Sequence, residues 1–181
     1  LYYMSGDPSL LDSARRAFAW TIANRRAPNG GFGHSRATDD DAHLGDTLAM
    51  AEAALALYRS TALRPYLGLA LDLGEIIMRD HRDQAGGFPS GGFIVRQPEP
   101  GARGVLAKPV KQLDENVAVT RLLNLLARQT SNAAFRAGAE HGMRYLISLA
   151  EDGFVVPGAL LADRELSREP AHVTVVGAKD D

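Results

Sequence analysis

Two acidic positions of the chain carry side chains that could act together as an acid/base pair. Asp46 begins one predicted helix, and Glu115, preceded by Asp114, begins another helix 69 positions later. Free backbone N–H groups and the helix dipole favour acidic side chains at helix N-termini. Paired carboxylates also carry out glycosidic-bond chemistry, one as proton donor and the other as base or nucleophile. These three carboxylates are therefore candidate catalytic residues, and the alternative is that they only cap helices.

Loop side chains near these carboxylates are candidates for binding a substrate. His34 and His43 precede the first helix and are suited to shuttling protons or contacting a sugar ring, or else they are plain surface residues. Asn116 follows Glu115 directly and belongs to the same group of candidates. Arg96 lies with other basic residues in a long loop and could bind an anionic group of a ligand, or simply interact with solvent.

Three Gly-Gly-Phe motifs, at residues 30–32, 86–88 and 91–93, punctuate the chain. No Gly-Lys-Ser/Thr follows any of them and no strand-to-helix context fits, so they are not phosphate-binding loops. The phenylalanines, Phe32 and Phe88 among them, are expected either to line a cavity or to plug the ends of helical hairpins.

The sequence indicates no metal ion or cofactor. Residues 39–41 are three consecutive aspartates, but the glycine and the downstream glutamate of a calcium loop are missing, which favours a solvated turn. His81, His141 and His172 have no spacing typical of a metal site and are expected to be structural. The chain contains no cysteine, so it has no thiolate ligand, thiol nucleophile or disulfide.

Composition favours one globular domain that binds a neutral or polar partner. The 181 residues are 45% hydrophobic and 23% charged, and 20 basic against 22 acidic side chains leave a formal charge of −2. This balance gives no excess of positive charge that would favour binding to nucleic acid or to an anionic membrane surface. The longest apolar run is too short to span a membrane. Cytoplasm and periplasm fit equally, and because the chain begins at Leu1 we expect it to be an excerpt of a larger protein.

An internal repeat predicts an all-α fold made of antiparallel helical hairpins. Six residues, Asp46 to Ala70 in the first copy, match Glu115 to Ala139 at an offset of 69. Inner helices are predicted at about 44–58 and 114–129, with outer partners at 66–79 and 132–149. Further helices are predicted at 8–23 and 158–168, a hairpin around 93–96, and a strand at 173–176. Six helices represent about three hairpins.

A resemblance to a known group extends this interpretation. It is carried by the motifs at residues 30–34, 44–50, 57–58, 86–88, 113–116, 143–146 and 173–177. The chain resembles the C-terminal helical region of bacterial thioredoxin-domain-containing proteins related to the spermatogenesis-associated thioredoxin-like protein. The resemblance implies part of an (α/α)6 toroid, similar to N-acylglucosamine 2-epimerases and several glycoside hydrolases. It also implies an upstream thioredoxin-like domain in the full-length protein.

Three functions remain open. The first is a noncatalytic toroid region that binds a ligand or partner and supports a neighbouring domain. The second is a carbohydrate-active site, a hydrolase or an epimerase, in which Asp46 and Glu115 share one rim with carboxylates within about 10 Å. The absence of histidine from both predicted inner helices counts against the epimerase. The third is an unrelated helical scaffold, such as a terpenoid-cyclase-like ring or a peptide-binding solenoid.

Overall fold

The chain folds into α-helices, as the sequence predicts. The computed structural model describes residues 2–34, 42–84, 90–98, 101–151, 153, 157–171 and 173. The α-helices are α1 (Tyr2–Ser5), α2 (Pro8–Arg25), α3 (Leu44–Thr61), α4 (Arg64–Ile76), α5 (Leu113–Thr130), α6 (Ala133–Glu151) and α7 (Pro157–Ser167). A π-helical turn, η1 (Ile77–His81), extends α4, and a 3₁₀ turn, η2 (Gly104–Ala107), lies in the long segment before α5. Within these residues the extended pairing is limited to isolated bridges, from Arg26 to Phe32 and from Arg82 to Phe93.

The repeat predicted from the sequence is present in the backbone. Helices α3 and α5 are each 18 residues long, and both their first and their last residues are 69 positions apart. Each helix ends on a residue in the left-handed conformation, Ala62 at φ 56° and Ser131 at φ 55°. This conformation ends a helix by directing the chain into a tight turn. The next helix then packs back against the first, giving the hairpins α3–α4 and α5–α6.

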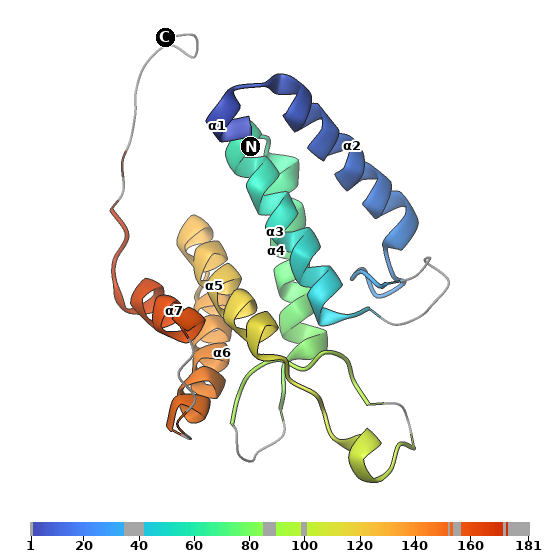
Figure 1. Cartoon of the computed structure of the whole chain (residues 1–181), viewed down its shortest axis with the longest axis vertical. Coiled ribbons are helices and arrows are strands. Elements are labelled where there is room, and N and C mark those ends of the chain that lie inside the picture. The colour runs from blue at the N-terminus through green and yellow to red at the C-terminus, as the bar shows by residue number, and fades with distance from the viewer. Residues whose placement is uncertain are drawn as a thin grey trace.

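The two hairpins pack against one another and enclose the main core. Helix α5 contacts both α3 and α4. Figure 1 shows α2 along one side of the α3–α4 hairpin and α7 beside the α5–α6 hairpin. The core between them is apolar, and its largest fully buried side chains include Phe32, Phe93, Phe135, Leu44, Leu73, Ile77, Leu123 and Leu126. Burial of these side chains is the main force holding the hairpins together.

Glycine allows α4 to approach the second hairpin closely. A Cβ atom on Gly74 would lie 2.7 Å from Leu126 Cδ1 and 2.9 Å from Phe135 Cε1. These distances are shorter than van der Waals contact, so the helix could not sit this close with a side chain there.

Two local predictions of extended structure are not matched. The hairpin expected around residues 93–96 is absent, because Phe93 makes only the single bridge to Arg82. Val173, the first residue of the expected strand at 173–176, is exposed and not in a strand, and residues 174–176 lie outside the described residues.

Candidate functional site

The loop between α2 and α3 is anchored by Phe32, and this anchor positions the two loop histidines. Phe32 is 1% exposed and bridges to Arg26 at the end of α2. Its N–H donates to Thr47 Oγ1 over 3.1 Å, and its carbonyl accepts from the N–H of His43 over 2.9 Å. Because both ends of the loop are tied to this one residue, His34 and His43 are brought next to each other at the start of α3.

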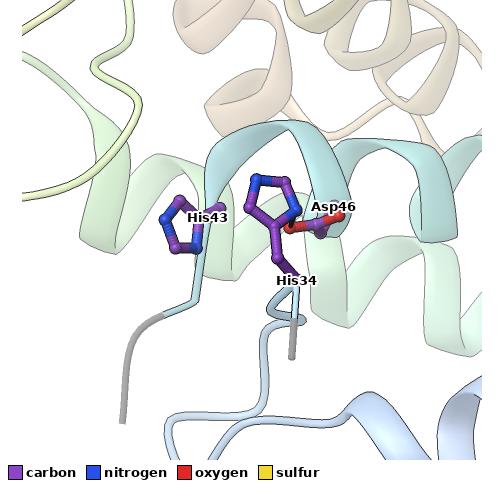
Figure 2. A group of neighbouring side chains, drawn as sticks. All are labelled: His34, His43 and Asp46. Carbon is purple, nitrogen blue, oxygen red and sulfur yellow. Dashed lines mark ion pairs between the residues drawn. The ribbon is translucent and has the colours of Figure 1, made fainter. Parts of the chain in front are cut away.

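The two histidines and Asp46 form a compact cluster, shown in Figure 2. His34 Nδ1 lies 2.7 Å from Asp46 Oδ2. The two imidazole rings are stacked, with centroids 4.5 Å apart and planes inclined by 25°. His34 is exposed, whereas His43 and Asp46 are half-buried. One donor atom from each of the three residues lies within 4.8 Å of the others.

Glu115 joins this cluster from the second hairpin. Its carboxylate lies against Gly45, since a Cβ atom at Gly45 would be 2.5 Å from Glu115 Oε1. Burial raises the pKa of Glu115, and the negative charges of Asp114 and Asp46 raise it further, while His34 opposes the rise. The first turns of α3 and α5 therefore lie next to each other at one rim, where the charge of Asp46 acts on Glu115.

Three polar atoms of the cluster are buried and have no hydrogen bond among the described residues: His43 Nδ1, Asp46 Oδ2 and Glu115 Oε2. Of these, Asp46 Oδ2 lies within ion-pair distance of His34 Nδ1, at 2.7 Å. Buried polar atoms are nearly always satisfied by protein, water or an ion. The cluster thus has unused hydrogen-bonding capacity.

The remaining candidates have different positions. Asp114 is exposed and acts on the cluster only through its charge. Asn116 is 0% exposed, and its side-chain amide bonds the backbone of Phe93 and of Gln112. Asn116 and Phe32 are therefore both buried in the internal framework, and the plugging interpretation of the Gly-Gly-Phe motifs fits Phe32. Phe88 lies outside the described residues.

Arg96 lines a separate cavity of about 510 Å³ beside the cluster. The lining residues are Asn29, Ala42, Arg79, Asp80, His81, Arg96 and Gln97. Ala42 is the neighbour of His43, so the cavity and the cluster adjoin. The sequence offered no sign of this cavity, because it is bounded by residues from three distant segments.

His81 is a buried cavity residue whose situation was not apparent from the sequence. It is 2% exposed, its Nδ1 donates to the carbonyl of Ile94 over 3.1 Å, and its Nε2 has no partner among the described residues. Burial lowers the pKa of His81, and the hydrogen bond to Ile94 opposes that effect. The π-helical turn Ile77–His81 places this histidine, and such turns are frequent at functional sites. Helical periodicity alone would not reveal the turn.

Comparison with protein-family models and with curated protein sequences finds no match for the chain. Within the described residues, no helix is both long and apolar enough to cross a membrane.

Proposed function

We propose that the chain is a ligand-binding region of a helical toroid, and that it binds a polar small molecule at the cluster of His34, His43, Asp46 and Glu115. The observation that carries the proposal is the convergence of these four titratable side chains, supplied by a loop and by the first turns of two repeated helices. His43 and Glu115 each carry a buried polar atom that has no hydrogen-bond partner among the described residues. A small number of converging polar groups is typical of a site that orients a ligand.

Titration with a defined panel of sugars tests this function. Glucose, N-acetylglucosamine and glucuronic acid are added to isotopically labelled protein, and amide shifts are followed by NMR. We expect saturable shifts at the start of α3 and α5 for at least one sugar, and their loss in Asp46→Asn and Glu115→Gln. Asp72→Asn is the matched control, because Asp72 is an exposed carboxylate on α4. Absence of saturable shifts with every sugar, or equal shifts in the cluster variants, would contradict the proposal.

A second candidate function is carbohydrate catalysis at the same rim. The observation that favours it is the pair of carboxyl groups at the first turns of α3 and α5, where burial and the charges of Asp114 and Asp46 raise the pKa of Glu115. In glycosidic-bond chemistry one carboxyl of such a pair donates a proton to the leaving group and the other acts as base or nucleophile. Hydrolysis of nitrophenyl glycosides tests it. The Glu115→Gln variant is expected to lose about 10²- to 10⁴-fold in rate, as is usual when a general acid is removed. Wild-type activity no higher than that of Glu115→Gln would reject this function.

The toroid itself is supported by the 69-residue repeat and by the resemblance to thioredoxin-domain-containing proteins. The α3–α4 and α5–α6 hairpins repeat with the same length and the same helix ends. Successive hairpins of this kind build rings and solenoids. The test is the coding sequence upstream of Leu1: a thioredoxin-like domain there supports membership of that group, and an unrelated domain argues against it.

A further inference from the structure

We propose that His34, His43 and Asp46 bind one divalent transition-metal ion. The inference goes beyond the proposed function, because it adds a metal ion at the same cluster that can be tested separately from the binding of a polar small molecule. Its basis is the meeting of three ligating side chains, whose donor atoms all lie within 4.8 Å of one another. The three residues are separated along the chain, and the Phe32 anchor described above brings them together.

The donor types define the class of metal. Two imidazole nitrogens and one carboxylate oxygen suit zinc and the neighbouring divalent ions manganese, iron, cobalt and nickel. Calcium and magnesium prefer sites made of oxygen alone. The chain has no cysteine, so thiolate-dependent metals are not favoured.

The geometry is close to that of a bound ion. A metal about 2.0 to 2.2 Å from each donor holds the donors about 3 to 3.5 Å apart. The present donors lie within 4.8 Å of one another, so the largest separation allowed by that limit would have to shorten by about 1.3 to 1.8 Å. His34 is mostly exposed, at 72% of its side chain, so its ring can turn out of the stack and exchange its contact with Asp46 for the metal.

The local charge also favours a cation. Asp46, Asp114 and Glu115 place three carboxyl groups in the first turns of α3 and α5. The N-terminal ends of α3 and α5 oppose a cation through their dipoles, but full carboxylate charges outweigh the partial charge of a helix end. His43 Nδ1 is buried and has no hydrogen-bond partner among the described residues, so no hydrogen bond to this atom fixes the orientation of the His43 ring.

Three protein ligands leave coordination positions open. Structural zinc sites use four protein ligands, whereas sites that bind water or substrate use three. The exposed position of His34 leaves the open side of the cluster toward solvent. The metal would thus present its open positions to a polar molecule bound at the same rim.

The test is calorimetric titration of the full chain, first treated with EDTA and dialysed, with ZnCl₂ and separately with CoCl₂. We expect one ion per chain and, with cobalt, visible absorption bands from nitrogen coordination. His34→Ala, His43→Ala and Asp46→Asn are each expected to weaken the affinity at least about 100-fold, since even an outer-shell partner is worth 10- to 100-fold. Asp72→Asn should bind as the wild type does. Circular dichroism confirms that each variant remains helical.

Failure of the metal inference and failure of the proposed function have different signatures. No binding of either ion, or unchanged affinity in His43→Ala, overturns the metal site. If sugars still give saturable shifts in the EDTA-treated protein, the ligand-binding function stands without the metal. If the ion binds and no sugar does, the metal site stands and the proposed function falls.

Discussion

The buried side chain of Asn116 holds the backbone of Phe93 by two hydrogen bonds. Its Oδ1 accepts the N–H of Phe93 over 2.6 Å and its Nδ2 donates to the Phe93 carbonyl over 2.9 Å. Thr47, at the equivalent position of α3, accepts the N–H of Phe32. In both repeats, the same helix position therefore ties a buried Gly-Gly-Phe phenylalanine to the first turn of the helix.

Replacing Asn116 by alanine should reduce the free energy of unfolding by about 2 to 3 kcal/mol, because it leaves the buried N–H and carbonyl of Phe93 unpaired. Urea unfolding followed by circular dichroism measures the change. Gln129→Ala, at an exposed position near the end of the same helix, is the control and should alter stability by less than about 0.5 kcal/mol. Equal stability of the two variants would contradict the role given to Asn116.

His141 makes the fold sensitive to acid. Its Nε2–H donates to the carbonyl of Gly92 and its Nδ1 accepts from Arg144, so the neutral ring satisfies both partners. Burial lowers the pKa of His141, and the positive charges of Arg82 and Arg144 lower it further. His141 therefore binds a proton near pH 6.5 in the unfolded chain but only at lower pH in the folded chain. The free energy of unfolding should fall as the pH drops through that value.

Urea unfolding at pH 7.5 and at pH 5.5 measures this dependence. The wild type should be less stable at pH 5.5, and His141→Gln should show a smaller difference between the two pH values. Part of the difference should persist in the variant, because burial also lowers the pKa of His81. An unchanged difference in His141→Gln would show that the dependence arises elsewhere.

The sequence correctly predicted where individual residues lie when their position in the 69-residue repeat was enough to place them. Asp46 and Glu115 lie in the first turns of α3 and α5, as their spacing predicts. It did not distinguish Asn116, whose amide points inward, from the neighbouring Glu115, which borders the rim. That difference depends on a hydrogen bond to Phe93, whose approach is set by tertiary packing.

At the scale of elements, the packing of α4 against the second hairpin depends on Gly74. Gly74→Ala should destabilise the protein by about 1 to 3 kcal/mol, because the added methyl group would collide with Leu126 and Phe135. Gly68, also in α4, has no atom within 4 Å of an added Cβ. Gly68→Ala should therefore stabilise the protein by about 0.5 to 1 kcal/mol, through helix propensity alone.

Thermal unfolding of the two variants under the same conditions measures this contrast. Both variants replace glycine by alanine in the same helix, so the contribution of helix propensity is the same in both. The difference between their stabilities therefore measures the effect of the close approach of α4 to the second hairpin. A stabilising effect at both positions would mean that the hairpins separate easily at this contact.

The helices were predictable because their signals are local. Asp7 caps α2 and Pro8 begins it, and the apolar pattern gave the start of α3 at residue 44. The π-helical turn at Ile77–His81 was not predictable, because the expected helix simply continued through it to residue 79. An inserted residue in a helical turn leaves no mark in a periodic pattern when the buried residues on either side remain apolar.

At the scale of the whole molecule, α7 is fastened to the second hairpin by polar contacts. Arg121 donates to both carboxylate oxygens of Glu165, over 2.8 and 2.9 Å. Asn124 and Arg128 donate to the backbone carbonyl of Glu165. The Arg121 guanidinium lowers the pKa of Glu165. The contribution of this ion pair should thus be present above the ordinary pKa of a glutamate and be lost as the pH falls through the lowered value.

Arg121→Ala should loosen the attachment of α7 to the second hairpin while leaving both hairpins folded. The expected observation is faster limited proteolysis at Arg164, with little change in the midpoint of global unfolding, because the pair is partly exposed and screened by solvent. Arg136→Ala removes an ion pair of similar exposure within α6 and should not alter cleavage at Arg164. Equal cleavage in both variants would show that apolar contacts alone hold α7.

The all-α class and the paired hairpins follow from the sequence, since hydrophobic periodicity and repetition specify them. The packing of the flanking helix α2 was less predictable from the sequence. Trp20 is 57% exposed in α2, and a cavity of about 570 Å³ lies between α2 and α3. How closely a flanking helix packs depends on surface complementarity, which no periodic pattern encodes.

Few side chains hold α2 against the rest of the protein, so ligand binding at His34 should be detectable along this helix. Of the 18 residues of α2, all described, only Phe18 is buried. A helix held this lightly should open by local unfolding, and its amide protons should exchange with deuterium sooner than those of α3 or α5. Its C-terminal end leads directly to His34, and Arg25 donates to the His34 carbonyl. A ligand that captures His34 should thus slow hydrogen exchange along α2, far from the atoms it touches.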